Sequence, residues 1–302
     1  MKDFNNKLIA IMEGGMGNKF GCIFHAYQLA KDTGKELVIS TVRNMHGDVG
    51  FHHLFSKTNG ITEVENTITE LDNLVPSDVP FLLHKSHFVK CGAIKPSRNV
   101  VYHQGKSHNE LVEYIKGLNS CCYLVDGYHA LQLPDMMTDV VRELKIQEDV
   151  LEKVNDICKQ YSIDKTVKGI HIRATDWPYK QETIDAAYTT IQRLVEDNPK
   201  QKIFVCCDEQ SIEKDLCDQL PDNIIVFNKN SYVKKAVEGT WREDVADVDG
   251  RVCNYNTLRD EESVVEAFID MLLLSRTDIA YGHHVSSFWY FAKIFSNLTE
   301  LK

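Results

Sequence analysis

The chain has 302 residues, of which 43% are hydrophobic and 26% are charged, and this is enough apolar material for two ordinary globular domains. Its formal net charge of -10 at pH 7 excludes broad electrostatic binding to nucleic acid or to an anionic membrane, because both reward a basic surface. We expect neither a signal peptide nor a membrane span, since the apolar runs are too short for either.

The nine cysteines indicate a reducing compartment. Their number is odd, and Cys121, Cys122, Cys206 and Cys207 lie inside apolar runs, where cysteine behaves as a small hydrophobic residue. No C-x-x-C pair occurs, so a zinc ribbon is not expected. We therefore expect a cytoplasmic protein without a disulfide framework.

The first elements in chain order form a βαβ unit. A strand over 7–12 leads into a glycine-rich turn, and a helix begins at Cys22 with apolar residues at helical spacing. Gly34 closes this helix as a C′ glycine, and a second strand follows over 36–40. The region from about 40 to 145 is irregular, and one or two connecting helices are expected over 135–164.

The second half of the chain alternates strands with helices. Strands are predicted over 168–173, 202–207, 223–227 and 278–282, and helices over 182–198, 209–220, 263–278 and 286–295. This alternation predicts parallel sheets and an α/β fold. We expect two domains, residues 1–148 and 149–302, that face each other across a cleft.

The glycine-rich stretch IAIMEGGMGNKFG does not match either of the common nucleotide-binding loops. A triphosphate loop has glycine before its lysine and a hydroxyl after it, whereas Lys19 stands between Asn18 and Phe20. A dinucleotide loop has G-x-G-x-x-G, and the third glycine, Gly21, comes one residue too late. A tight turn that merely needs glycine remains an alternative.

An NADP-dependent oxidoreductase stays open as a second alternative. Arg43 follows the second strand, where an arginine suits a 2′-phosphate. Tyr161 and Lys165 also have the Y-x-x-x-K spacing of some reductases.

GIHIRATDW, residues 169–177, is the sharpest pattern. The period of a strand places His171 and Arg173 on one face at its carboxyl end, which is where ligands bind in open α/β sheets. The planar guanidinium of Arg173 suits a diphosphate, and Asp176 is placed to hold it. A plain surface pair of arginine and aspartate is the alternative.

Three further positions can be interpreted either as ligand-binding residues or as purely structural ones. Asp208 ends a strand, where a carboxylate takes a ribose or caps a helix. Asp270 binds a ligand or continues a polar stripe with Glu266. Ser286 and Ser287 begin the last helix, as an anion site or as caps. A D-x-D in the acidic loop 244–250 is a candidate for a metal, whereas His46, His52 and His53 lack the spacing of a zinc site, and we expect no metal.

Taken together, the blocks resemble the GDP-fucose-dependent fucosyltransferases of the nodulation and core α1,6 type, and more distantly the α1,2 and protein O-fucosyltransferases. GGMGNKFGCIFHAYQLAKDTGKELVI is similar to their N-terminal glycine loop and helix, and GIHIRATD to their H-x-R-R-x-D motif. IFVCCDEQSIEKDL resembles their strand ending in T-D-[DE]. SVVEAFIDMLLLSRTDIAYGHHVSSF resembles their closing helix, strand and serine pair.

The resemblance implies a GT-B fold of two Rossmann-like domains, with GDP-fucose as donor, no cofactor and a glycan or other hydroxyl acceptor. Arg173 then grips the β-phosphate, and His171 and Asp270 read the guanine. Asp208 lies near the ribose, and Ser286 and Ser287 lie near the phosphates. From the N-terminal domain, Gly15, Gly17 and Asn18 approach the diphosphate.

The sequence departs from the family motif at two positions. Ala174 replaces the second arginine, and Trp177 replaces the lysine that often follows the aspartate. The glutamate proposed as base in relatives aligns near Gln181, so Asp176 and Glu182 are the candidates for the catalytic base. These departures also leave open a catalytically idle protein that binds a nucleotide sugar.

Overall fold

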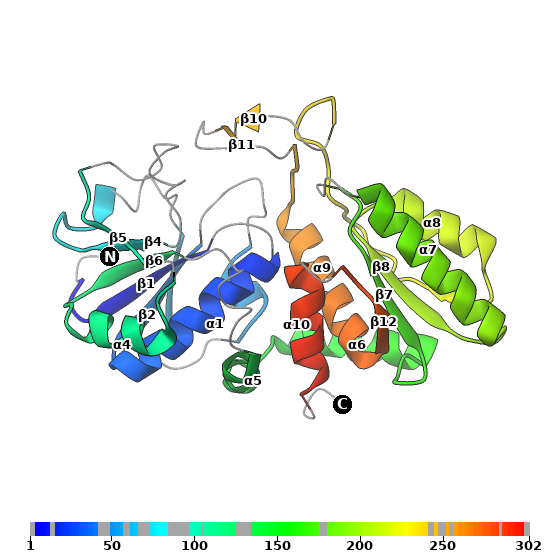
Figure 1. The fold of residues 1–302 in the computed structure, drawn as a ribbon, viewed down its shortest axis with the longest axis horizontal. Coiled ribbons are helices and arrows are strands. Elements are labelled where there is room, and N and C mark those ends of the chain that lie inside the picture. The colour runs from blue at the N-terminus through cyan, green and yellow to red at the C-terminus, as the bar shows by residue number, and fades with distance from the viewer. Residues whose placement is uncertain are drawn as a thin grey trace. The chain divides into compact units, whose positions relative to one another are not determined.

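The structure is a computed structural model and describes residues 4–12, 16–41, 49–56, 61–65, 73–83, 97–103, 105–124, 134–175, 180–240, 245–246, 252–253, 256–283 and 286–298. The chain divides into two compact units. The N-terminal unit comprises residues 1–145 and 244–254, and the C-terminal unit comprises residues 146–243 and 255–302. Each unit contains a parallel sheet with helices packed beside it, which confirms the α/β class (Figure 1).

The N-terminal unit is built on a six-stranded sheet with the order β3-β2-β1-β6-β4-β5, and all of its strand pairs are parallel. Its strands are β1 (Lys7–Met12), β2 (Glu36–Thr41), β3 (Ile61–Glu65), β4 (Phe81–Leu83), β5 (Val100–Tyr102) and β6 (Cys121–Leu124). Its helices are α1 (Met16–Thr33), the short η1 (Phe51–His53), α4 (His108–Lys116) and α5 (Pro134–Glu143). Helix α1 packs on β1 and β2, and α4 and α5 pack on α1. A small antiparallel pair, β10 (Val245–Ala246) and β11 (Val252–Cys253), also belongs to this unit.

Helix α1 begins at Met16, six residues earlier than the sequence predicted, so Gly17 and Asn18 are helical. The expected glycine loop is therefore shorter. Burial explains this, because Phe20 and Phe24 stack with ring centroids 5.5 Å apart, and both pack edge-on against Phe55. Aromatic packing of this kind outweighs the helix propensity that glycine loses, about 1 kcal/mol per residue. At the other end, Gly34 has a φ of 67° and Lys35 N–H donates to Ala30 C=O, as predicted for a C′ glycine.

The region that looked irregular in the sequence contains β3 to β6 and α4. Strand β4 is a three-residue, fully buried run without the alternation by which a strand is recognised. Helix α4 has a capping box that the sequence does display, with Ser107 Oγ accepting from Glu110 N–H. The carboxylate of Glu110 accepts from Ser107 N–H at 2.7 Å in return. This S-x-x-E pattern was the available evidence for the helix.

A chain of hydrogen-bonded side chains crosses the interior of the N-terminal unit. Tyr123 Oη lies 2.6 Å from His25 Nδ1, and His25 Nε2 lies 3.2 Å from His108 Nδ1. His108 Nε2 lies 2.8 Å from the Asp32 carboxylate. Burial raises the pKa of Tyr123 well above its ordinary value, so the phenol remains a donor. With an ionised Asp32, every member donates to the next one and no proton is left without an acceptor.

The C-terminal unit is built on a four-stranded sheet with the order β12-β7-β8-β9, again with parallel pairs. Its strands are β7 (Lys168–Ile172), β8 (Ile203–Cys207), β9 (Ile224–Ile225) and β12 (Asp278–Tyr281). Its helices are α6 (Glu148–Tyr161), α7 (Lys180–Asp197), α8 (Gln210–Gln219), α9 (Glu261–Arg276) and α10 (Ser287–Ser296). Helices α7 and α8 lie on one face of the sheet, and α9 lies on the other with α6 and α10 packed against it (Figure 1). Every strand and helix predicted in this half is present.

The two faces of this sheet have different roles. Ile170, Ile172, Val205 and Cys207 point into the apolar core beneath α7 and α8. Since side chains alternate along a strand, His171 and Cys206 point to the opposite face, where α9 lies.

Gly169 also points toward α9, and it allows the end of that helix to approach the sheet closely. A Cβ at this position would overlap Thr277 Oγ1 and lie 2.7 Å from Leu274 Cδ1. The close packing of α9 on β7 therefore depends on the missing side chain.

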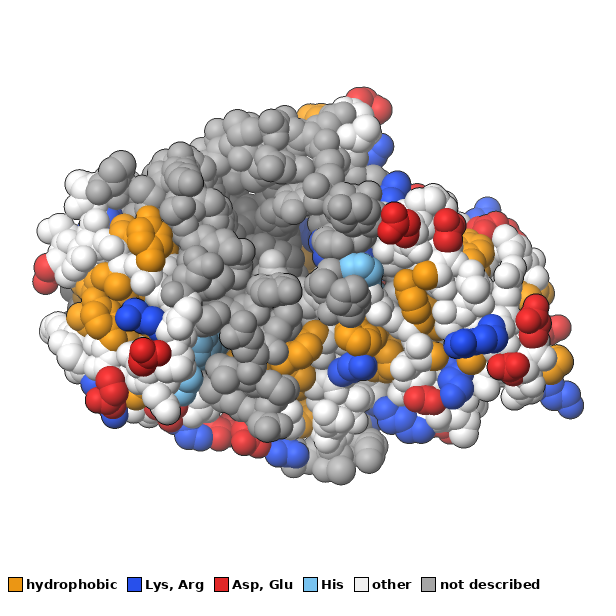
Figure 2. Space-filling model, viewed as in Figure 1, with side chains coloured by type: hydrophobic (Ala, Val, Ile, Leu, Met, Phe, Trp, Pro, Cys, Tyr) orange, Lys and Arg blue, Asp and Glu red, His pale blue; other side chains and the backbone are white. Residues whose placement is uncertain are grey.

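None of the described helices is long and apolar enough to cross a membrane. Figure 2 shows basic and acidic side chains interspersed over the described surface of the C-terminal unit on the face in view.

Candidate active site

His171, Arg173 and Asp208 lie at the carboxyl ends of the neighbouring strands β7 and β8. His171 is the penultimate residue of β7 and is only 7% exposed. Its ring stacks on Phe288 of α10, with centroids 4.6 Å apart and planes 10° from parallel. The stacking joins the end of β7 to the first turn of α10, two elements more than 100 residues apart in sequence.

The surroundings of His171 keep it neutral. Burial, together with the nearby charges of Arg173 and His283, lowers its pKa to about 3. Its Nδ1 is buried and makes no hydrogen bond to any described residue. A neutral imidazole with an unused nitrogen can accept from, or donate to, a bound polar molecule according to its tautomer.

Arg173 is the first residue after β7 and is half-buried. The residues that follow it are fixed by Asp208 at the end of β8. Ala174 N–H donates to Asp208 Oδ1 at 2.7 Å, and Thr175 O–H donates to Asp208 Oδ2 at 2.6 Å. Both oxygens of Asp208 are thus engaged by the turn that carries Arg173.

The N-terminus of α10 joins this cluster through Phe288, which stacks on His171. Ser286 is its N-cap and is buried, but its hydroxyl makes no capping hydrogen bond. Ser287 is the first helical residue, and Phe288 after it makes the stack with His171. The free N–H groups and the helix dipole of such a terminus favour an anion. A partly buried guanidinium and a helix N-terminus therefore flank the same buried imidazole.

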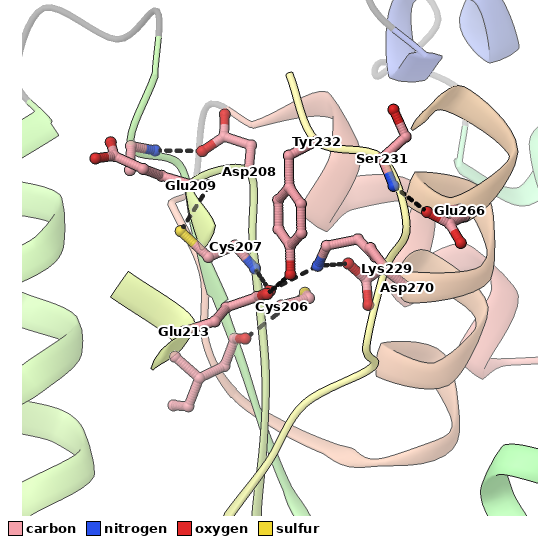
Figure 3. A network of polar contacts seen from close by, with 12 residues as sticks. Cys206, Cys207, Asp208, Glu209, Glu213, Lys229, Ser231, Tyr232, Glu266 and Asp270 are labelled. Atoms are coloured by element: carbon pink, nitrogen blue, oxygen red, sulfur yellow. Dashed lines mark hydrogen bonds and ion pairs between the residues drawn. The ribbon is translucent and has the colours of Figure 1, made fainter. Parts of the chain in front are cut away.

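Asp270 of α9 lies in a buried ionic network that the sequence did not reveal (Figure 3). Lys229 Nζ lies 2.6 Å from Asp270 Oδ2 and 2.6 Å from Glu213 Oε1, and Tyr232 O–H donates to Glu213 Oε2 at 2.6 Å. Burial alone would lower the pKa of Lys229, but Asp270 and Glu213 raise it above its ordinary value, so the ammonium persists. Burial raises the pKa of Asp270 to about 7, against the opposing effect of Lys229.

The remaining oxygen of Asp270, Oδ1, is buried and has no hydrogen-bond partner among the described residues. A buried acceptor without a partner costs free energy that a ligand with N–H groups can recover. Lys229 was missed because it lies outside any predicted element. Glu213 was the available indication, since it occupies the inward stripe of α8 with Leu216 and a buried carboxylate needs a cation.

The other predicted site residues lie elsewhere or outside the described residues. Glu182 is in the first turn of α7 and is exposed. Gly17, which is buried, and Asn18 are in the first turn of α1 and belong to the N-terminal unit. Gly15 and Asp176 lie outside the described residues, as does the D-x-D of the acidic loop. Within the described residues, no three histidine, cysteine or carboxylate side chains are grouped as metal ligands would be.

Lys165, which with Tyr161 suggested an oxidoreductase, has a structural use. Its ammonium donates to Ser275 C=O at 2.9 Å and to Thr277 C=O at 2.8 Å, and so caps the end of α9. Tyr161 is the last residue of α6.

With two parallel α/β units, the chain has the architecture of the GT-B fold, and solved structures bear this out. The fucosyltransferase NodZ from Bradyrhizobium superposes with a TM-score of 0.59 at 16% identity, over 96% of this chain and 91% of that one. A variant of Arabidopsis thaliana FUT1 in complex with GDP gives 0.56 at 14% identity, over 97% and 69%. POFUT1 in complex with GDP-fucose gives 0.51 at 12% identity, over 97% and 94%.

The chain therefore shares the fold of the GT-B fucosyltransferases over nearly its whole length. No protein-family profile matches it. No curated protein sequence matches it either. At this level of identity the likeness establishes the fold, and the chemistry has to be argued from the site.

Proposed function

We propose that the chain is an inverting, metal-independent glycosyltransferase that transfers fucose from GDP-fucose to a glycan or another hydroxyl acceptor. The observation that carries this proposal is the stack of His171 on Phe288. It brings the Arg173 end of β7 together with the N-terminus of α10, and a guanidinium beside the positive end of a helix dipole suits a diphosphate.

In the proposed reaction the acceptor hydroxyl attacks the anomeric carbon of fucose from the face opposite GDP. The bond between that carbon and the β-phosphate oxygen breaks, and GDP departs with the electron pair. The guanidinium of Arg173 and the N–H groups of α10 stabilise the negative charge that develops on the diphosphate, which is the role that a metal ion has in other transferases. His171 and Asp270 contact the guanine, and Ser286 and Ser287 lie near the phosphates.

The acceptor proton goes to a carboxylate, and Asp176 and Glu182 are the two candidates for this base. Replacing each carboxylate by its amide distinguishes them. The replacement that removes the true base should lower kcat by about 10²- to 10⁴-fold, with little change in the affinity for GDP. Glu182 is exposed, which fits a base that meets an acceptor arriving from solvent.

A thermal-shift panel with GDP, GDP-fucose, GMP and NADP tests the donor. A ligand at 100 times its Kd should stabilise the protein by about 2.7 kcal/mol. We expect stabilisation by GDP and GDP-fucose, and loss of the GDP effect in Arg173→Ala but not in Arg193→Ala, an exposed arginine on α7. Stabilisation by NADP alone, or an unchanged GDP effect in Arg173→Ala, contradicts the proposal.

A catalytically idle nucleotide-sugar-binding protein is the second candidate. Ala174, which stands where the family motif has a second arginine, is completely buried, and its N–H is bound to Asp208. That position therefore offers no side chain to a donor. GDP release measured with and without glycan acceptors distinguishes a transferase, which releases GDP faster with its acceptor, from a binding protein, which does not.

We also propose a cytoplasmic location. The seven cysteines whose side chains are described are free thiols, which suits a reducing compartment. Detection of a fluorescent fusion in the cytoplasm tests this.

A further inference from the structure

Both carboxylate oxygens of Asp208 accept hydrogen bonds from the turn that follows the neighbouring strand, β7. Oδ1 accepts a hydrogen bond from the backbone N–H of Ala174 at 2.7 Å, and Oδ2 accepts one from the hydroxyl of Thr175 at 2.6 Å. Thr175 is 2% exposed and Ala174 is fully buried, whereas Asp208 is half-buried, so water is excluded from the donor side of both bonds. Charge-assisted hydrogen bonds to an ionised carboxylate are the strong ones, and they are strongest where water is excluded.

The backbone is fixed on both sides of Arg173, by the pairing of β7 with β8 and by Asp208. On one side, Ile172 pairs in register with Cys207 of β8. On the other side, Ala174 is bonded to Asp208, the residue after Cys207. The Cα of Arg173 is thus held between two attachments to the same neighbouring strand. The side chain of Arg173 starts from a fixed point and in a fixed direction.

We propose that Asp208 is a positioning residue, which aims Arg173 through the turn 174–175 and does not bind the ribose. The proposal rests on the proposed function, in which Arg173 grips the β-phosphate. A misplacement of about 1 Å at a binding group costs up to about 10²-fold in rate. Loss of Asp208 should then weaken the contact to the β-phosphate. It should not weaken the contact to the ribose, to which only the resemblance assigned Asp208.

The test compares ligand deletions with residue deletions. Kd is measured by calorimetry for GDP, GMP and 2′-deoxy-GDP with the full-length wild-type protein and with Asp208→Ala, Arg173→Ala and the double variant. The ratio of the Kd values for GMP and GDP reports the contact to the β-phosphate. The ratio of the Kd values for 2′-deoxy-GDP and GDP reports the contact to the ribose.

We expect Asp208→Ala to reduce the preference for GDP over GMP by about tenfold, toward the value in Arg173→Ala. The double variant should lose no more than Arg173→Ala alone, because the two residues act in series. The 2′-deoxy penalty should stay within about twofold of wild type, since non-interacting sites are additive to a few tenths of a kcal/mol. Asp215→Ala, which removes an exposed carboxylate of α8, is the matched control and should change neither ratio.

Two conservative variants give readouts that a loss of folding cannot imitate. Asp208→Asn can still accept from Ala174 N–H and can donate to the Thr175 hydroxyl, so it should restore most of the GDP preference lost in Asp208→Ala. Thr175→Val removes one of the two hydrogen bonds without changing the shape of the side chain. It should lower the GDP preference less than Asp208→Ala does, again with the 2′-deoxy penalty intact.

The opposite pattern overturns the inference. If Asp208→Ala or Thr175→Val keeps the GDP preference, or if Asp208→Ala abolishes the 2′-deoxy penalty, Asp208 does not act through Arg173. A GDP preference that survives in Arg173→Ala is a different failure. It removes the diphosphate contact of the proposed function itself, and the positioning role is then overturned with it.

Discussion

Lys229 and Asp270 form an ion pair of 2.6 Å in the interior of the C-terminal unit, and each side chain is no more than 5% exposed. Glu213 completes the pair from α8, so one ammonium faces two carboxylates (Figure 3). The carboxylate that the resemblance assigns to guanine is therefore already half-engaged within the protein. A guanine that binds Asp270 can use Oδ1, because Oδ2 is already paired with Lys229.

We predict that Lys229→Met destabilises the protein by about 3–5 kcal/mol, because it leaves two buried carboxylates without a cation. Urea unfolding followed by circular dichroism measures this. The double variant Lys229→Met/Asp270→Asn should recover part of the loss, since it removes one of the uncompensated charges. Lys234→Met is the matched control, because Lys234 forms an exposed pair with Asp260 at 3.6 Å and its loss should cost less than about 1 kcal/mol. Equal losses in the two lysine variants would contradict the prediction.

His171 should make the stability of the protein sensitive to acid. An unfolded histidine binds a proton near pH 6.5, whereas the pKa of the folded His171 is about 3. Between these values the unfolded state binds more protons, so the free energy of unfolding falls as the pH is lowered. Its contribution is complete above pH 6.5, and the loss between pH 8 and pH 5 is about 2 kcal/mol.

His171→Phe keeps the stacking on Phe288 and removes the titration. The difference between the free energies of unfolding at pH 8 and pH 5, measured in urea, should therefore shrink by about 2 kcal/mol relative to wild type. An unchanged difference means that folded His171 protonates normally.

Gly169→Ala should separate α9 from the sheet or strain the contact. The new Cβ overlaps Thr277 Oγ1, and overpacking of this kind typically costs about 1–3 kcal/mol. At Gly117, by contrast, a Cβ meets only the Tyr114 carbonyl, at 3.4 Å, and the φ of -75° suits alanine. Thermal unfolding of Gly169→Ala and Gly117→Ala should show a lower Tm only for the former. A wild-type Tm for both would mean that α9 yields without cost.

Tyr123→Phe should interrupt the hydrogen-bonded chain that ends at Asp32. Phenylalanine fits the space of tyrosine, but it leaves His25 Nδ1 without its phenol donor, and such a loss costs about 1–3 kcal/mol. Tyr114→Phe, at a side chain that is 37% exposed, serves as the control and should stay within about 0.5 kcal/mol of wild type. Urea unfolding of the two variants gives the comparison, and equal stabilities would show that the phenol of Tyr123 contributes nothing.

The C-terminal sheet was predictable because its strands are apolar and its helices have periodic patterns. Strand β8 and helix α8, which follow each other between Ile203 and Gln219, are an example. The strands β3 to β6 were not, since a three-residue run such as Phe81–Leu83 has no period to detect. The start of α1 was predicted too late because tertiary packing of Phe20 overrides the local preference of glycine. At the site, the strand period predicted that His171 and Arg173 share one face of the strand, and His171 lies on the face that α9 covers. Lys229, the partner of Asp270, lies in a segment without regular structure, so no local sequence pattern indicates it.

The last strand of the C-terminal sheet, β12, pairs with β7 across 110 residues, as in the register of Asp278 with Lys168. Helix α9, which covers the same face of β7, also arrives late. On a ribosome that adds about 5–20 residues per second, β7 emerges roughly 5–20 s before the elements that cover it. For that interval the nascent chain exposes an unpaired edge and an uncovered face of β7. Premature termination within 241–260, before α9, would leave that state permanent, and such a fragment is prone to edge-to-edge aggregation.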